Sequence, residues 1–221
     1  MKANLNGYYD EIESTASKKD ELLELLKNYS VSAHTNEEDE FDYLENDDVT
    51  LVVKNPLGGE DLQIELGAEF SLFFELWHLH YSAYKADYER MKKDILTIVG
   101  GNSGAMTFFA DGKWVGSTLC PEIPAEDAKG TDLVEKYWAW EDDSYAQKNK
   151  EKLLTLGGEI RFTCWNPAND RTFPVPSDMP QQPPSPDGYH NTYQSSQQYP
   201  LPMQARLQSG NSLQSKYRQL Q

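Results

Sequence analysis

The sequence predicts an α+β domain in which helices pack on one face of a mainly antiparallel sheet of about five to six strands. Three observations lead to this prediction. Short runs of alternating apolar and polar residues are joined by turn residues, a pattern typical of β-hairpins. Segments with helical periodicity lie between those hairpins. Strands that follow one another through tight turns pair antiparallel, so the hairpins also predict the sheet type.

The first hairpin is predicted over residues 49–66. The run Val49–Lys54 has an alternating pattern and ends at a cluster of Asn, Pro and Gly residues at 55–59, which is a turn by composition. A return strand with Leu and Ile at alternate positions follows over 62–66. The apolar run Glu69–Leu76 then predicts a third strand and, with it, an antiparallel meander.

A second hairpin is predicted around Asp111-Gly112, the strongest short turn signal in the chain. Its two strands are Met106–Phe109 and Trp114–Leu119. The last predicted strand is Glu159–Trp165, which follows a Gly-Gly pair.

Four segments are predicted as helices. The clearest is Tyr84–Val99, whose apolar side chains recur at helical spacing and which ends at Gly100-Gly101. A shorter helix is expected over Lys18–Asn28, with Ser17 as its N-cap. Two more are expected over residues 131–140 and 143–156. In the former, Trp138 is expected to pack inward.

The composition divides the chain into a domain over residues 1–175 and a tail over 176–221. The tail holds 10 Gln, 7 Pro and 7 Ser among its 46 residues, with no Glu and almost no aliphatic clusters. Such a segment buries too little apolar surface to offset its ordering entropy, so we expect it to be disordered in isolation.

The acidity of the chain resides in the domain. The tail holds three basic and two acidic side chains, which leaves 17 basic and 34 acidic ones in residues 1–175, a formal charge of −17. A domain with this field repels nucleic acid and anionic membranes and attracts basic protein surfaces. The simplest alternative is that the acidity provides solubility alone.

The cysteines and the absence of a leader favour a cytoplasmic protein. Cys120 and Cys164 form neither a zinc motif nor a Cys-x-x-Cys redox motif, and both lie in apolar strand-like runs. They are expected to be buried thiols in a reducing compartment. The first residues lack the apolar core of a signal peptide, and no run approaches the roughly 18 apolar residues of a membrane span.

The densest charge lies in the acidic segment, Glu37–Asp48, which holds eight acidic residues in twelve. We expect an exposed loop or a poorly formed turn, because like charges at this density resist compaction. Carboxylates that steer and aromatic side chains that anchor suit recognition of a basic protein. The candidate binding residues are Glu37, Glu38, Asp39, Glu40, Phe41, Asp42, Tyr43, Glu45, Asp47, Asp48 and the more distant Trp140. The alternative is that Phe41 and Tyr43 attach the loop to the core and that Trp140 fills its edge.

A second candidate site is centred on His78 and His80. His-x-His on a strand places both imidazoles on one face, as in many metal sites, and Glu69, Glu75 or Asp87 could add a carboxylate. The favoured interpretation is that the two histidines are packing residues, and a third alternative is that a histidine contacts a partner. No metal, cofactor or catalytic set is predicted.

Three classes of function follow. The first is a non-catalytic protein that docks a basic surface; in size and charge it is similar to immunity proteins, which neutralise basic toxins such as nucleases, although no motif carries the similarity. A variant is a nucleic-acid mimic that occupies the groove of a defence or regulatory protein. The second class is a metal-dependent domain centred on His78 and His80. The third is an adaptor acting through its tail, whose weakly amphipathic basic end, Met203–Leu220, could also pack against its own acidic domain.

Overall fold

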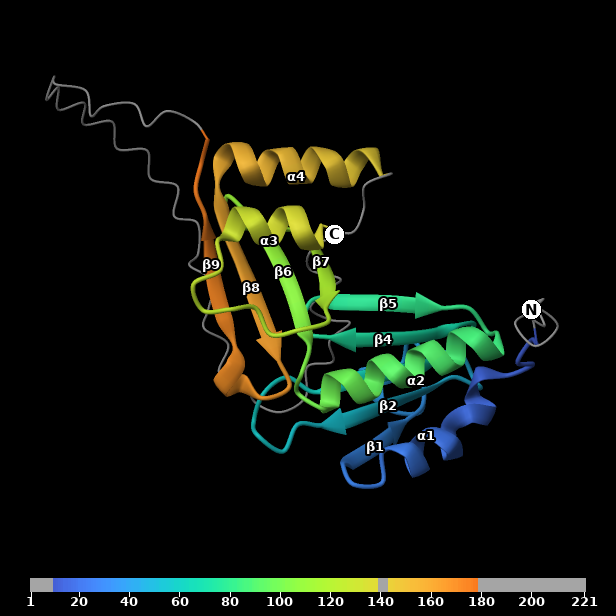
Figure 1. Ribbon diagram of the computed structural model, residues 1–221. Coiled ribbons are helices and arrows are strands. Elements are labelled where there is room, and N and C mark those ends of the chain that lie inside the picture. Colours follow the sequence, from blue (N-terminus) through green and yellow to red (C-terminus); the bar gives the residue numbers. More distant parts are fainter. Residues whose placement is uncertain (1–9, 139–142, 179–221) are drawn as a thin grey trace, which may run out of the picture.

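The computed structural model describes residues 10–138 and 143–178, which form two antiparallel sheets and four α-helices (Figure 1). The first sheet and two helices come from the N-terminal part of the chain, and the second sheet with the other two helices follows. Each sheet has its own apolar core. The α+β class and the antiparallel pairing are confirmed, but the strands divide between two sheets where one sheet was expected.

The first sheet is a meander in the order β1-β2-β3-β4-β5. Each strand pairs antiparallel with the next one along the chain, which confirms the predicted hairpin over 49–66. Two strands were not expected separately, β1 and β5. The five strands are Ser30–His34 (β1), Val49–Lys54 (β2), Leu62–Leu66 (β3), Phe70–Phe74 (β4) and Trp77–Tyr81 (β5).

Helices α1 (Lys19–Leu25) and α2 (Lys85–Val99) lie on the same face of this sheet (Figure 1). Alternate side chains of the strands point to that face because the side-chain period of a strand is two. They meet Leu22 of α1 and the stripe formed by Met91, Ile95 and Ile98 of α2, all fully buried. The helix predicted over Tyr84–Val99 is therefore confirmed, together with its apolar face.

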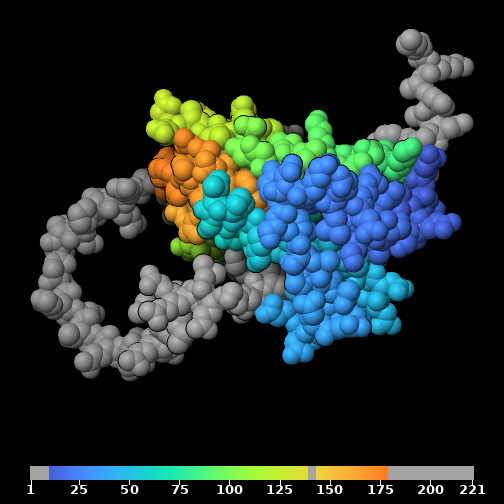
Figure 2. All heavy atoms as spheres, turned by 90° about the horizontal axis from the view of Figure 1, so that it is seen from below, coloured from blue at the N-terminus to red at the C-terminus, as the bar shows by residue number. Residues whose placement is uncertain are grey.

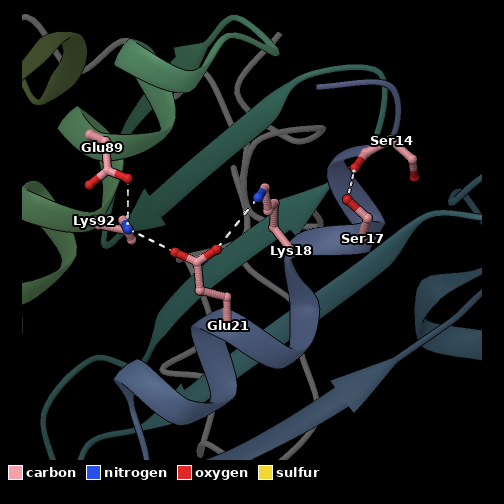
Figure 3. Close-up of polar contacts among 6 residues, drawn as sticks. All are labelled: Ser14, Ser17, Lys18, Glu21, Glu89 and Lys92. Carbon is pink, nitrogen blue, oxygen red and sulfur yellow. Dashed lines mark hydrogen bonds and ion pairs between the residues drawn. The ribbon is translucent and has the colours of Figure 1, made fainter. Parts of the chain in front are cut away.

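The start of the first helix differs from the prediction. A 3-10 turn over Thr15–Lys18 precedes α1, and the Ser17 hydroxyl donates to the carbonyl oxygen of Ser14 at 2.6 Å (Figure 3). Ser17 thus belongs to that turn and does not cap α1, which has no side-chain N-cap.

An ion pair joins the two helices of this half. The carboxylate of Glu21 in α1 accepts from Lys92 Nζ in α2 at 2.8 Å, and Lys92 also reaches Glu89 at 2.9 Å (Figure 3). The hydrogen bond from Lys92 lowers the pKa of the Glu21 carboxyl group. This contact fixes α1 against α2 on the outer side of the helical layer.

The second sheet has the strand order β7-β6-β8-β9 and is also antiparallel. Its strands are Gly104–Ala110 (β6), Lys113–Cys120 (β7), Gly158–Cys164 (β8) and Arg171–Val175 (β9). Helices α3 (Gly130–Tyr137) and α4 (Ser144–Leu156) cover one face of it (Figure 1). The predicted hairpin between β6 and β7 is confirmed, with positive φ at Asp111 (51°) and Gly112 (70°) as a two-residue turn of this kind requires.

The two sheets meet where the end of β7 approaches β5 (Figure 1). The Ser117 hydroxyl of β7 donates to the carbonyl oxygen of Leu76, in the turn between β4 and β5, at 2.9 Å. Trp165, which directly follows β8, belongs to the core of the first sheet. The second half of the chain therefore completes the first core.

Two further sequence-based predictions concern the C-terminal tail and the absence of a membrane span. Most of the predicted tail, from residue 179 on, lies outside the described residues. Within the described ranges, no helix combines the length and the apolar character needed to cross a membrane.

Candidate partner-binding surface

The acidic segment Glu37–Asp48 connects β1 to β2 and has a defined backbone. A 3-10 helix over Asp39–Phe41 forms its first half. Phe41 N donates to the carbonyl oxygen of Glu38 at 2.8 Å, and Leu44 N donates to that of Phe41 at 3.0 Å. The segment is therefore a series of hydrogen-bonded turns, more ordered than the loop that charge repulsion alone predicts.

Two apolar side chains anchor the acidic segment. Phe41 is 4% exposed and Leu44 is 5% exposed, although their neighbours in the sequence are mostly exposed acids. The Phe41 ring stacks on the His34 imidazole with centroids 4.3 Å apart. The Tyr43 hydroxyl accepts a hydrogen bond from Gln63 Nε2 of β3 at 3.3 Å. Phe41 and Tyr43 thus attach the segment to the sheet, as the structural alternative expected.

His34 links β1 to the acidic segment, and both of its ring nitrogens have partners. Nδ1 lies 2.7 Å from Glu38 Oε2, and Nε2 lies 2.7 Å from the Ser32 hydroxyl. Across the loop, Asn36 Nδ2 donates to Asn46 Oδ1 at 3.0 Å. These contacts fix the ends of the segment relative to each other.

Most carboxylates of the acidic segment face solvent, and they lack Lys and Arg partners in the described part of the chain. Seven of its eight acids are exposed, and Asp48 is half-buried. Within residues 10–138 and 143–178, none of them forms an ion pair with Lys or Arg, and Glu38 pairs with His34 alone. Elsewhere, acids do pair with basic side chains, as Asp61 does with Lys54 at 2.7 Å and Glu122 with Lys136 at 2.6 Å. The negative field of this segment is therefore locally uncompensated.

His78 and His80 lie on β5, with both imidazoles on the same side of the strand. Their ring centroids are 5.2 Å apart, and Phe73 of β4 stacks on His78 at 5.8 Å. His80 Nδ1 lies 3.0 Å from Glu69 Oε1 and 2.9 Å from the Ser71 hydroxyl. Burial lowers the pKa of His78, and the neighbouring His80 lowers it further.

The other carboxylates considered for a metal site lie elsewhere. Glu75 occupies the turn between β4 and β5 with φ of 56°, and its carboxylate accepts a hydrogen bond from the backbone N–H of Leu76. Asp87 is on α2, across the sheet, and pairs with Arg90 at 3.1 Å. No group of three or more His, Cys, Asp or Glu side chains with metal-binding geometry occurs in the described part of the chain.

The strand register brings the two candidate sites to the same face of the first sheet. His34 pairs with Thr50, Thr50 with Glu65, Glu65 with Ser71 and Ser71 with His80. Directly opposed residues in adjacent strands share a face, so this row crosses the sheet from the acidic segment to the two histidines, a distance of about 19 Å over four strand spacings. We call this face, opposite α1 and α2, the open face.

The acidic segment lies at one border of the molecule. In the space-filling view, the light-blue atoms of this stretch form the edge farthest from the green atoms of α2 (Figure 2). A partner can therefore approach the carboxylates without displacing either helix.

Two tryptophans lie near residue 140, Trp138, which was expected to pack inward, and Trp140, which was a candidate for this surface. Trp138 is 4% exposed and packs on Phe108 with ring centroids 4.9 Å apart, which confirms that it points inward. Trp140 lies outside the described residues, so its place in the binding surface stays a prediction.

Both cysteines are free and buried, as expected. Burial raises the pKa of the Cys120 thiol, whose Sγ contacts the carbonyl oxygen of Glu122 at 3.0 Å. A buried thiol with a raised pKa is a poor nucleophile.

Sequence reasoning did not find His34, Gln63 or Phe73 as parts of the surface. The spacing of His34 and Glu38, four residues apart, was a weak signal for their contact, whereas Gln63 and Phe73 join the surface through strand register.

No protein-family model, curated protein or solved structure matches this chain.

Proposed function

We propose that this chain is a non-catalytic partner-binding or inhibitor protein that docks a basic protein surface through the acidic segment. The observation that carries the proposal is the set of exposed carboxylates without Lys or Arg partners in the described residues, held on a backbone that Phe41 and Leu44 anchor. Charges held in place lose little entropy on binding.

The chemistry of the surface defines the class of partner. A basic cleft that binds phosphates presents Lys and Arg at spacings that a row of carboxylates can satisfy. Nucleases, nuclease-type toxins and nucleic-acid-binding regulators have such clefts. The net charge of −16 would also raise the rate of encounter by about 10- to 1,000-fold through electrostatic steering.

The proposal places the protein in the cytosol, where its two free thiols would stay reduced. It requires no metal and no reaction. Immunity-type neutralisation and nucleic-acid mimicry present the same carboxylates, so the identity of the captured partner distinguishes them.

The test compares three forms of the full chain in affinity capture from the native cell. The segment variant carries Glu37→Lys, Glu40→Lys, Asp42→Lys and Asp47→Lys, four exposed residues. A matched control carries Glu13→Lys, Asp20→Lys, Asp127→Lys and Glu151→Lys, which are exposed but scattered. Both variants have the same net charge, so they separate local from global electrostatics.

We expect the native chain and the scattered control to retain the same basic partner, and the segment variant to lose it. With that partner purified, the segment variant should bind at least about tenfold more weakly at low salt, with a flatter dependence of affinity on salt. Equal retention by the two variants, or enrichment of neutral and acidic proteins alone, would refute the proposal.

A further inference from the structure

The open face of the first sheet is more buried at its centre than an uncovered sheet face should be. Gln63 is 2% exposed, Ser71 is 3% exposed and Phe73 is 5% exposed. The Thr50 hydroxyl on the same face is buried without a hydrogen-bond partner in the described structure. An antiparallel sheet with one solvated face carries exposed polar side chains there, so these residues imply a cover.

The described residues supply part of that cover. Through Tyr43 and Phe41, the acidic segment packs over the β1–β3 side of the face. Helices α1 and α2 occupy the opposite face, and α3 and α4 pack on the second sheet (Figure 1). Within the described ranges, no α-helix therefore lies over Ser71 and Phe73 on the β4–β5 side.

We propose that the C-terminal segment of this chain, residues 203–221, docks on the β4–β5 side of the open face. The docking surface is formed by Phe73 with the flanking imidazoles of His78 and His80, bordered by the carboxylates of Glu65 and Glu69. This intramolecular contact does not depend on the partner proposed above.

Charge complementarity favours this occupant. The segment 203–221 contains Arg206, Lys216 and Arg218 and no acidic residue, whereas residues 1–175 carry a formal charge of −17. Arginine also stacks favourably on aromatic rings, and its planar donors match carboxylates. A basic segment tethered to an acidic domain has its nearest binding surface in that domain.

The apolar pattern of the segment fits the same surface. Leu213, Tyr217 and Leu220 follow the i, i+4, i+7 spacing of one helical face, with Lys216 and Arg218 beside them. A tyrosine ring suits a cluster of one phenylalanine and two imidazole rings, because aromatic pairs gain from offset or edge-on contact.

The linker between the domain and the segment 203–221 is long enough to reach the open face, and it raises the effective concentration of the segment there. The described chain ends at Asp178, whose N–H bonds to the carbonyl oxygen of Leu154 at 3.3 Å. The linker over 179–202 would span about 27 Å as a flexible coil, and at most roughly 80 Å when extended. An effective concentration in the millimolar range then allows weak contacts to hold the segment in place.

The test places a nitroxide spin label on the full chain through Ser215→Cys, which preserves the apolar stripe. Cys120 and Cys164 are fully buried and should remain unlabelled. We expect the backbone amide NMR signals of Ser71, Phe73 and His78 to lose most of their intensity, and those of α4 to keep it. A label at Ser185→Cys, in the linker, is the control and should not produce this pattern.

Two further samples decide the outcome. Adding Lys216→Glu and Arg218→Glu to the labelled chain should restore the lost signals, because the charge complementarity is removed. Mixing labelled, isotopically silent chain with unlabelled, isotope-enriched chain should broaden nothing if the contact is intramolecular. Uniform or absent broadening in the first sample refutes the docking, and broadening that appears in the mixed sample shows that copies exchange tails instead.

Discussion

The Phe41 ring lies parallel to the His34 imidazole, with centroids 4.3 Å apart and an angle of 13° between the planes. Phe41 belongs to the acidic segment, and His34 ends β1. The stack therefore holds a stretch of repelling carboxylates against the edge of a sheet. Because Phe41 is almost fully buried, the contact also removes from water the largest apolar side chain of the segment.

Replacing Phe41 by alanine should release the acidic segment and destabilise the domain. The ring belongs to neither of the two core clusters, so we expect a loss of about 3 kcal/mol, the lower end for Phe→Ala in cores. Denaturant unfolding of the full chain measures it. Tyr43→Phe is the control, since it keeps the ring and removes the hydroxyl that accepts from Gln63, a hydrogen bond worth about 1 kcal/mol. Equal effects of the two changes would mean that Phe41 is no anchor.

The contact between Glu21 and Lys92 predicts a pH dependence. Because Lys92 lowers the pKa of the Glu21 carboxyl group, the folded state favours the ionised form. Its contribution to stability is present above the ordinary carboxyl pKa and is lost as the pH falls through the lowered folded value. Glu21→Gln should therefore destabilise the domain at pH 7, and the difference from the native chain should shrink in acid.

The control for this pair is Glu24→Gln in the same helix. Glu24 pairs with Lys27 at 2.7 Å within the exposed surface of the same turn, where such pairs contribute about 0–1 kcal/mol. We expect a smaller loss there. Free energies of unfolding at several pH values decide the matter, and a Glu21→Gln effect that does not vary with pH would contradict the assignment.

The sequence predicted the elements whose signals are local. Asp111-Gly112 marks its hairpin because both residues tolerate positive φ, and Gly101, with φ of 71°, marks the end of α2. The β4–β5 turn escaped prediction because Glu75 adopts positive φ with no Gly or Asn to signal it. Strand β9 contains Pro174, which is tolerated at a sheet edge but argues against a strand.

The pairing of strands that are far apart in the chain could not be predicted from local sequence patterns. Strand β6 pairs with both β7 and β8, and β8 comes from beyond two intervening helices, so the division into two sheets depends on long-range contacts. The arrangement of the candidate site could likewise be predicted only in part. Charge density located the acidic segment, whereas its position on the same face as His78 and His80 follows from the register of five strands.

The two cysteines should be unreactive in the folded chain. Burial raises the pKa of Cys120, and Cys164 is fully buried beside the carbonyl oxygens of Gly101 and Ser103. A thiol reagent such as a disulfide dye should modify neither at pH 7 on the timescale of minutes, and both at once in denaturant. Rapid modification of one cysteine in the native chain would show that its surroundings open.

The imidazole of His78 should titrate below the ordinary value of about 6.5. Burial disfavours its charged form, and the charge that His80 acquires adds repulsion. Between the two pKa values, the unfolded chain binds a proton at His78 that the folded chain does not bind. The free energy of unfolding therefore falls as the pH drops from the ordinary pKa toward the lowered pKa of the folded state. NMR titration of the ring protons measures the midpoint directly.

The variant His80→Gln separates the two causes of the lowered His78 pKa, desolvation and the charge of His80. It removes the neighbouring charge and leaves the contact between His78 and Phe73, so the His78 midpoint should rise but remain below the ordinary value, since desolvation is the larger cause. His78 is itself an exposed residue, so the desolvation comes from neighbours such as the stacked Phe73 ring. A His78 midpoint at or above the ordinary value in the native chain would show that this packing does not desolvate the imidazole.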